Sequence, residues 1–360
     1  MNGKKWSFMV IAVYLGLMIL IGLTIIIIDP FFHYHKPLAS LSYTFDNQEH
    51  TNNGIARHFD YNAMITGTST TEPLDVLTAE ELFEVQAVDL IFRGEGFKRI
   101  NDNLSVALAA NPDLEFILWG LDPMFFITGA DFERYKEYPD YLYDDNIFND
   151  VNYIFNKEVI LQGVVPIMNR TLQNAFSDIL YKPLSEAEHI EEKAMKELAQ
   201  NNFPDNYKRR EKREKIVDQN ETDSYLTMLR ENIEQNVIPS IEQYPDVSFY
   251  IFFPPYSIAW WDDLNQHGQE IVLRRISLER YVVETLLEYD NVTLFSFQNH
   301  YDVVCNFDYY RDTVHYNANA GNELMRLMKE GKYQLTKDNY KDYFEEITDF
   351  YCNFDYDAMF

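Results

Sequence analysis

The sequence has few of the residues on which several classes of protein depend. It contains two cysteines, Cys305 and Cys352, in 360 residues, which are too few for a cysteine-based zinc site. Lys and Arg number 30 against 58 Asp and Glu, so the net charge is −28. Because contacts to nucleic-acid phosphates need cationic side chains, this balance argues against nucleic-acid binding. The sequence also shows no internal repeat and no low-complexity linker.

Long apolar runs are equally scarce, and a single one is present. Residues 6–28 carry no charge, and these 23 residues suffice to cross a bilayer. Lys4 and Lys5 precede the run, Asp29 ends it, and no small-x-small cleavage site follows. We therefore expect a cytoplasmic tail at residues 1–5, a transmembrane anchor at 6–28 in the lipid bilayer, and an extracellular main domain of a single-pass protein of the cell membrane.

The sequence leaves open the roles of two sets of side chains, the cysteines and three histidines. An extracellular location would allow a disulfide between Cys305 and Cys352, and the sequence does not decide whether it forms. A juxtamembrane segment at residues 29–59 contains His33, His35 and His58. These histidines are metal ligands by type, although packing or contact with lipid headgroups explains them more simply.

The rest of the chain alternates between strand and helix patterns. We expect strands at 63–66, 85–92, 114–121, 247–253 and 292–297, and helices at 74–83, 97–110, 224–244, 270–289 and 318–329. This alternation predicts an α/β fold with a parallel sheet and right-handed crossovers. Residues 130–223 interrupt the pattern and are interpreted as an insertion, either a lid or a separately packed helical subdomain. A helical extension is expected at residues 331–360.

The first strand leads into a polar turn that contains Ser69. Gly67 permits a sharp turn, and Thr70 or Thr71 followed by Pro73 resembles the start of a helix. Ser69 would then lie at the carboxyl end of a strand, beside the positive end of a helix. Open α/β sheets bind their ligands at this edge.

A second stretch, D-T-V-H-Y, comes after the fifth strand and directly before the helix at 318–329. Its position brings Asp312 and His315 to the same sheet edge as Ser69. A serine hydroxyl needs a base to take its proton, and a histidine base needs a carboxylate to orient it. The three side chains therefore predict nucleophilic catalysis.

With these residues the chain resembles the SGNH/GDSL hydrolase superfamily, in particular membrane-anchored, cell-envelope-associated members of Gram-positive bacteria. Four short blocks carry the resemblance, namely G-T-S-T at 67–70, R-G-E-G at 93–96, G-L-D-P at 120–123 and D-T-V-H at 312–315. The resemblance implies a three-layer, flavodoxin-like fold over residues 60–330, with a central parallel sheet, a helical insertion and no cofactor.

The resemblance also implies roles for individual residues. Ser69 would be the nucleophile, His315 the general base and later the acid, and Asp312 its orienting partner. The backbone N–H groups of Ser69 and Gly94 would form the oxyanion hole, with Gly96 as the alternative to Gly94.

Two positions depart from the family pattern. Thr68 stands where the first block usually has Asp. The third block usually has an Asn whose side chain donates to the oxyanion, and Asp122 is the nearest candidate for that position here. An ionised Asp cannot donate a hydrogen bond, so the oxyanion hole would be incomplete or built differently. Asp122 could instead pair with Arg93.

These features lead to three functional hypotheses. The first is a serine esterase or O-acyltransferase acting on an acylated cell-envelope or extracellular glycopolymer, or on a small ester, with Tyr256 and Trp260 stacking on sugars. The second is a catalytically inactive SGNH-fold protein that binds polymer or assists assembly. The third, less favoured, is a metal-dependent phosphatase that uses the three juxtamembrane histidines.

Overall fold

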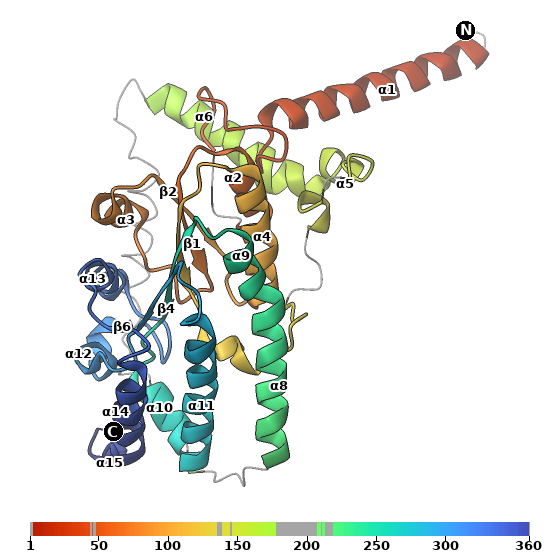
Figure 1. Ribbon diagram of the computed structural model, residues 1–360. Helices are drawn as coiled ribbons and strands as arrows, with labels where there is room; N and C mark the ends of the chain where they lie inside the picture. Colours follow the sequence, from red (N-terminus) through yellow and green to blue (C-terminus); the bar gives the residue numbers. More distant parts are fainter. Residues whose placement is uncertain are drawn as a thin grey trace. The chain divides into compact units, whose positions relative to one another are not determined.

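The computed structural model describes residues 3–43, 45, 48–134, 139–144, 146–177, 207–209, 211–212 and 219–359. The chain divides into two compact units (Figure 1). The first unit comprises Met1–Phe59 and Glu137–His189, and the second comprises Asp60–Lys136 and Ile190–Phe360. The described residues 139–144 and 146–177 of the predicted insertion thus pack with the N-terminal segment, whereas residues 130–134 belong to the second unit. Most of its remainder, including 178–206 and 213–218, lies outside the described residues.

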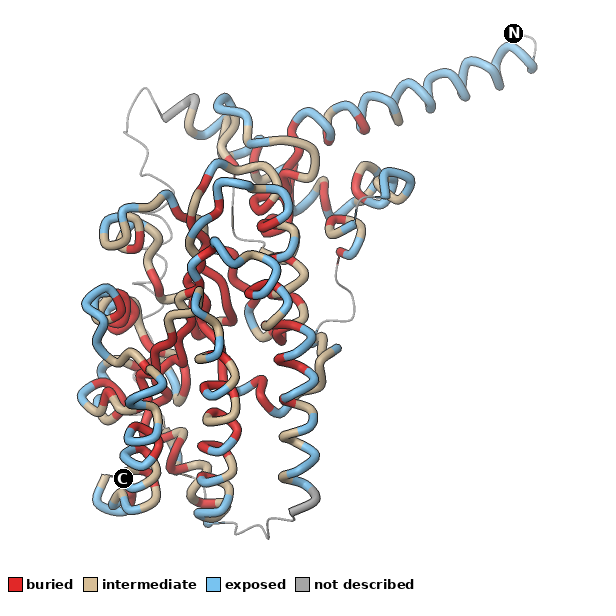
Figure 2. Tube along the Cα trace, viewed as in Figure 1, coloured by how far each residue is buried: buried red, intermediate tan, exposed pale blue. Residues whose placement is uncertain are grey.

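The first unit is helical. Its elements are α1 (Gly3–Ile28), α2 (Gln48–His58), the 3-10 helix η2 (Asp140–Leu142), α5 (Val151–Ile154), the π-helix η3 (Val159–Val164) and α6 (Val165–Ser177). Among the described helices, α1 is the one that is long and apolar enough to cross a membrane. Most of its surface is exposed (Figure 2), and its buried residues Gly22, Ile25 and Ile28 form one stripe near its end. The cytoplasmic side of its N-terminus stays a prediction.

The second unit is built around a six-stranded sheet. Its strands are β1 (Ala63–Gly67), β2 (Ala87–Ile91), β3 (Phe116–Gly120), β4 (Ser248–Phe253), β5 (Val292–Ser296) and β6 (Gln334–Leu335). They follow the order β2-β1-β3-β4-β5-β6. The first five are parallel, in the register Ile65↔Leu118 for β1 and β3, and β6 is antiparallel to β5. The predicted mixed α/β fold with a mostly parallel central sheet is therefore confirmed.

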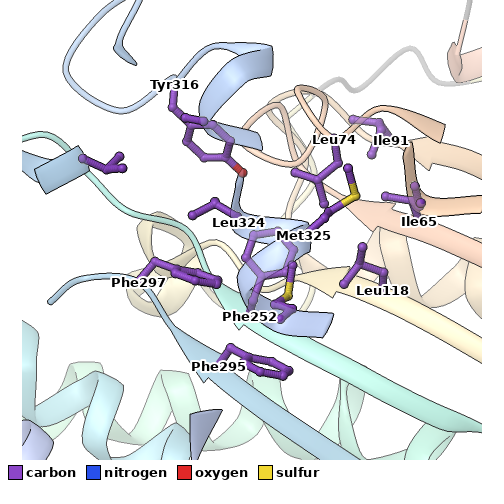
Figure 3. Packing of buried hydrophobic residues seen from close by; sticks show 14 of the residues in the cluster. Ile65, Leu74, Ile91, Leu118, Phe252, Phe295, Phe297, Tyr316, Leu324 and Met325 are labelled. Carbon is purple, nitrogen blue, oxygen red and sulfur yellow. The ribbon is translucent and has the colours of Figure 1, made fainter. Parts of the chain in front are cut away.

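Helices cover both faces of this sheet (Figure 1). The helices of this unit are α3 (Val76–Phe83), α4 (Phe97–Ala110), η1 (Pro123–Ile127), α8 (Gln219–Asn236), α9 (Ile238–Gln243), α10 (Ile258–Asn265), α11 (Gln269–Leu286), α12 (Tyr301–Val304), η4 (Phe307–Tyr309), α13 (Ala318–Lys329), α14 (Tyr340–Asn353) and α15 (Tyr356–Met359). Because strand side chains alternate between faces, Ile65, Leu118 and Phe252 share one face. There they pack with Leu324 and Met325 of α13 (Figure 3). Helices α4, α8 and α11 lie on the opposite face.

The sequence predicts most of these elements closely. The five expected strands are present to within about two residues at each end, and the expected bounds of α4 and α13 agree with the structure. The expected C-terminal helix is α14, which buries Tyr343, Phe344, Ile347 and Tyr351 on one face. Strand β6 was not predicted, because its two residues are too few to show a period.

The predicted helix start after Ser69 is wrong. The hydroxyls of Thr68 and Thr70 lie 3.1 Å apart, and residues 68–74 form turns. Helix α3 begins only at Val76, where the Asp75 carboxylate caps it by accepting from Thr78 N at 2.8 Å. The N-terminus of α3 therefore does not lie at Ser69.

Candidate active site

The structure brings together the three side chains that the sequence singled out, in one series. Ser69 Oγ lies 2.8 Å from His315 Nε2, and His315 Nδ1 lies 2.7 Å from Asp312 Oδ2. Ser69 and His315 are half-buried and Asp312 is exposed, so solvent reaches all three. In this geometry the imidazole can take a proton from Ser69 while Asp312 orients its other nitrogen.

Ser69 is held by a turn that follows the carboxyl end of β1. The turn closes through a hydrogen bond from Thr71 N to Thr68 O at 2.9 Å. Gly67 has φ +151°, and a Cβ at this position would lie 2.8 Å from Gly120 O on the neighbouring strand. A glycine is therefore required here both for the backbone conformation and for the close approach of β3.

His315 and Asp312 are held by a loop that is fastened at several points. Arg311 N donates to His315 O at 2.8 Å inside the loop. From outside, Ser257 donates to Thr313 O through both its N–H at 3.1 Å and its hydroxyl at 2.8 Å. The loop thus presents the histidine from a fixed backbone, which limits the conformational entropy lost on binding.

The carboxylate of Asp312 is fully used as an acceptor. Its Oδ1 accepts from the N–H groups of Val314 at 2.9 Å and His315 at 2.8 Å. The surrounding chain removes some water from the carboxylate, which opposes ionisation, but the bonds from the ring and backbone of His315 and from the backbone of Val314 outweigh this. They hold the pKa of Asp312 below its usual value. Asp312 is therefore an anion at neutral pH.

Behind Ser69 lies a buried polar network centred on Asp122. Its Oδ2 accepts from the hydroxyls of Thr68 at 2.6 Å and Thr70 at 3.3 Å. Its Oδ1 accepts from the Tyr256 hydroxyl and from Met124 N, the latter at 2.9 Å. Asp122 is 3% exposed, so these donors replace the water that a buried carboxylate loses.

This network corrects one expectation for Asp122 and agrees with another. The residue does not pair with Arg93, whose guanidinium forms an ion pair with Glu72. Its carboxylate accepts hydrogen bonds from four donors and so cannot serve as the oxyanion donor that the family pattern has at this position.

The two backbone N–H groups expected to form the oxyanion hole, those of Ser69 and Gly94, make no hydrogen bond within the described part of the chain. Gly94 has φ +73°, and a Cβ there would lie 2.6 Å from Arg134 Nη1. Gly96, the alternative donor, is the N-cap residue of α4. A guanidinium and the positive end of a helix therefore lie beside R-G-E-G, and both favour negative charge.

The proposed sugar-stacking residues are placed less favourably. Tyr256 is fully buried and its hydroxyl donates to Asp122, so its ring has no surface for a ligand. The expectation for Tyr256 is wrong for this reason. Trp260 is partly exposed and packs edge-on against Tyr256, with ring centroids 4.6 Å apart, and Arg275 lies over its ring at 5.3 Å.

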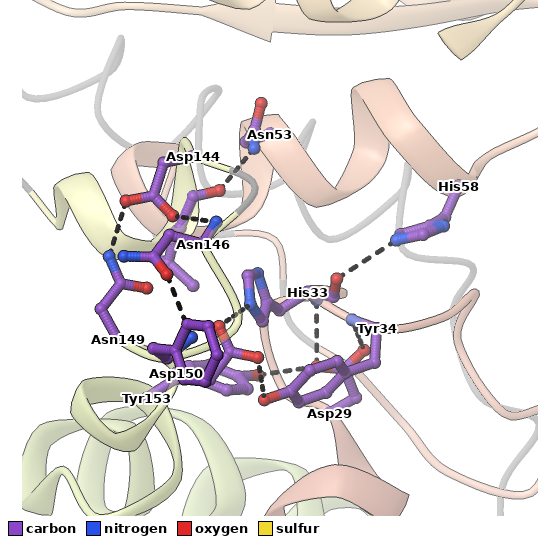
Figure 4. Close-up of polar contacts among 12 residues, drawn as sticks. Asp29, His33, Tyr34, Asn53, His58, Asp144, Asn146, Asn149, Asp150 and Tyr153 are labelled. Atoms are coloured by element: carbon purple, nitrogen blue, oxygen red, sulfur yellow. Dashed lines mark hydrogen bonds and ion pairs between the residues drawn. The ribbon is translucent and has the colours of Figure 1, made fainter.

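The juxtamembrane histidines of the first unit are engaged with the protein. His33 Nε2 lies 3.2 Å from Asp150 Oδ1, and His58 Nε2 lies 3.3 Å from His33 O (Figure 4). The His35 ring nitrogens lie 2.6 and 3.1 Å from backbone carbonyls. Among the described residues, no group of three or more His, Cys, Asp or Glu side chains could hold a metal ion. The geometry gives the phosphatase hypothesis no support.

The cysteines are free thiols, so the disulfide that the sequence left open is not formed. Burial, with a smaller contribution from Asp302, raises the pKa of Cys305 to about 11. A protonated thiol is a poor nucleophile, and neither cysteine is part of the site.

Sequence reasoning did not predict that Arg134 lies beside Gly94 or that Thr70 donates to Asp122. Arg134 lies in a segment without a clear period, and Thr70 was assigned to a helix start. No local pattern marks either residue, because both depend on contacts with distant parts of the chain.

In comparisons with known proteins, no family model and no curated protein matches this chain.

Proposed function

We propose that this protein is a membrane-tethered, extracytoplasmic serine esterase or O-acyltransferase of the SGNH type, acting on an acylated cell-envelope or extracellular glycopolymer. The observation that carries the proposal is the hydrogen-bonded series of Ser69, His315 and Asp312, with distances of 2.8 and 2.7 Å. These residues come from segments 246 positions apart in the chain.

In the proposed reaction, Ser69 Oγ attacks the ester carbonyl and His315 Nε2 takes its proton. The carbonyl oxygen becomes an anion beside the free N–H groups of Ser69 and Gly94. Each such donor is worth on the order of 3 kcal/mol of transition-state stabilisation. His315 then protonates the leaving alcohol, and an acyl-Ser69 ester remains. Water or a sugar hydroxyl then attacks the acyl carbon while His315 takes its proton. The bond from the acyl carbon to Ser69 Oγ breaks and His315 returns the proton to Ser69, which completes hydrolysis or transfer.

The fold is consistent with this proposal. The strand order 2-1-3-4-5 is that of flavodoxin-like sheets. The blocks at 67–70, 93–96 and 120–123 lie at the carboxyl ends of β1, β2 and β3, at the sheet edge where such folds bind ligands.

The two residues that depart from the family pattern contact each other in the structure. Thr68 donates its hydroxyl proton to Asp122 at 2.6 Å. The chain thus has a donor in the first block and an acceptor in the third, where the family usually has an acceptor and a donor.

A specific observation favours an alternative, a catalytically inactive protein that binds polymer or assists assembly. Because Asp122 is an acceptor for four donors, it supplies no third donor to an oxyanion. An active site would then depend on the backbone N–H groups of Ser69 and Gly94 alone among the expected donors.

A fluorophosphonate probe separates the two functions, because it reacts only with an activated serine. We expect the full-length chain to be labelled at Ser69, and Ser69→Ala to lose the label. Ser277→Ala is the matched control, since Ser277 is an exposed serine on α11. Hydrolysis of a small acetyl ester should follow the same pattern. A wild-type chain without label at Ser69 would leave the inactive protein as the better description.

A further inference from the structure

A row of exposed apolar side chains lies on the outer side of η3 and α6 in the first unit. It consists of Leu161, Val165, Met168 and Leu172, with exposed fractions of 64%, 41%, 38% and 52%. On a helix, the spacing of Val165, Met168 and Leu172 places them on one face, with Leu161 one turn earlier. Phe148 and Phe155, near α5, are also exposed, at 89% and 44%. We call Leu161, Val165, Met168 and Leu172 the apolar row.

This row is separate from the face that η3 and α6 turn to their own unit. Val159, Gly163 and Ile167 are buried on that other side. The segment is therefore apolar on two faces, whereas a surface helix in water has a polar outer face. Its only charged residue between Val159 and Ser177 is Arg170, although the whole chain has a net charge of −28. Such a surface indicates contact with an apolar partner.

The segment is packed against the end of the apolar helix α1. A Cβ built on Gly22 of α1 would lie 3.2 Å from Ile154 Cγ2 of α5, and a Cβ on Gly163 of η3 would lie 2.6 Å from the Pro30 side chain. Gly22 is six residues before the end of α1 at Ile28, which is about 9 Å along the helix axis. Helix α5 therefore lies level with the last turns of α1.

Hydrogen bonds fasten α5 to the chain where it leaves α1 (Figure 4). Asp29, which is fully buried, accepts from the N–H groups of His33, Tyr34 and His35 at 2.7 to 3.0 Å. The Tyr153 hydroxyl also donates to Asp29, at 2.8 Å. Asp150 accepts from the Tyr34 hydroxyl at 3.0 Å. These bonds keep α5 beside the end of α1.

We propose that α5, η3 and α6 lie in the membrane interface, with the apolar row buried at the boundary between headgroups and acyl chains. The 26 residues of α1 span about 39 Å, and a hydrocarbon core of about 30 Å takes up about 20 of them. If the core begins at Trp6, after Lys4 and Lys5, it ends near Ile25, which is the level of α5. A bilayer that holds α1 therefore extends to α5, and its headgroup region extends to Pro30 and the adjacent Gly163 of η3, at the start of the segment that carries the apolar row. The surface is a second membrane contact, and it rests on the proposed anchoring of α1.

Spin labels test this proposal in the full-length chain, reconstituted at one molecule per nanodisc. Cys305 and Cys352 are first replaced by Ser, and single cysteines are then introduced as Met168→Cys and Leu172→Cys. The matched controls are the exposed neighbours, Asn169→Cys and Gln173→Cys. Leu17→Cys, exposed on α1, reports the anchor itself. Each label is read by its collision rates with oxygen, which concentrates in lipid, and with a nickel chelate, which stays in water.

We expect the labels at 168 and 172 to have an oxygen-to-nickel ratio severalfold above those at 169 and 173, and closer to that at 17. The proposal is overturned if label 17 is in lipid while labels 168 and 172 meet the nickel chelate as readily as their neighbours. Exclusion of both reagents from 168 and 172 would show that a protein, not lipid, covers the row. An aqueous label at 17 would refute the anchoring together with the interface contact. None of these outcomes depends on catalysis at Ser69.

Discussion

Replacing Asp312 with asparagine tests the proposed mechanism most directly. In the structure, Oδ1 accepts from two backbone N–H groups and Oδ2 accepts from His315 Nδ1. Asparagine has one acceptor oxygen. If that oxygen keeps the two backbone bonds, the amide NH₂ faces Nδ1, and the imidazole proton moves to Nε2. His315 would then donate to Ser69 instead of accepting its proton.

The expected loss can be worked from the exposure of the pair. Two unit charges at about 4 Å attract by about 1 kcal/mol in water and about 4 kcal/mol at a partly buried site. The side chains of Asp312 and His315 are 54% and 28% exposed, so an intermediate value of about 2 to 3 kcal/mol applies to the imidazolium that forms during the reaction. This corresponds to about a 100-fold loss of rate, smaller than the loss of about 10⁴-fold for the buried Asp of chymotrypsin-like proteases.

The assay is the rate of labelling by a fluorophosphonate probe, together with acetyl-ester hydrolysis, on the full-length chain. Asp308→Asn is the matched control, because Asp308 is an exposed aspartate of the same region, on η4, and the site does not use its side chain. We expect the control to keep the wild-type rate. If Asp312→Asn also reacts within about twofold of wild type, far from the 100-fold expected from the charge pair, the assigned role of Asp312 is wrong.

Three further predictions concern the surroundings of the site and the first unit. Tyr256→Phe removes a buried donor to Asp122 and should lower the free energy of unfolding of the second unit by about 1 to 2 kcal/mol; an unchanged denaturation midpoint would count against the network. Burial, opposed by a weaker effect of Glu158, holds the pKa of His50 at about 4. The unfolded chain therefore binds more protons between pH 4 and 6.5, so stability should fall by up to about 3 kcal/mol on acidification across that window. Hydrogen exchange of α2 at pH 5 and 7, corrected for intrinsic rates, measures this loss of stability. If the same loss persists in His50→Gln, a group other than His50 causes it. Gly94→Ala puts a Cβ at φ +73° against Arg134, which strains the backbone by about 1 to 3 kcal/mol. Relief of this strain should move the Gly94 N–H out of place and slow the labelling of Ser69. A wild-type labelling rate would remove Gly94 from the oxyanion hole.

Local sequence patterns predict the elements of the second unit well. Buried strands such as Ala63–Gly67 read as short apolar runs, and α13 shows its N-cap at Asn317 and its apolar face at Leu324 and Met328. Where a local signal was ambiguous, the prediction failed. Thr70, Thr71 and Pro73 match a helix start, but tertiary contacts hold Thr70 in a turn at Asp122.

The sequence by itself determined the long apolar helix at residues 3–28, the α/β alternation, and the choice of Ser69, Asp312 and His315 as residues to examine together. These follow from short-range properties, namely hydropathy, period and the edge at which parallel strands end. Only the tertiary structure decided that Asp122 is an acceptor for Thr68 and Tyr256, that Tyr256 is buried, and that residues 139–177 pack with the N-terminal segment. Each of these depends on contacts between residues far apart in the chain, and a contact of this kind leaves no periodic trace in the sequence on either side of it.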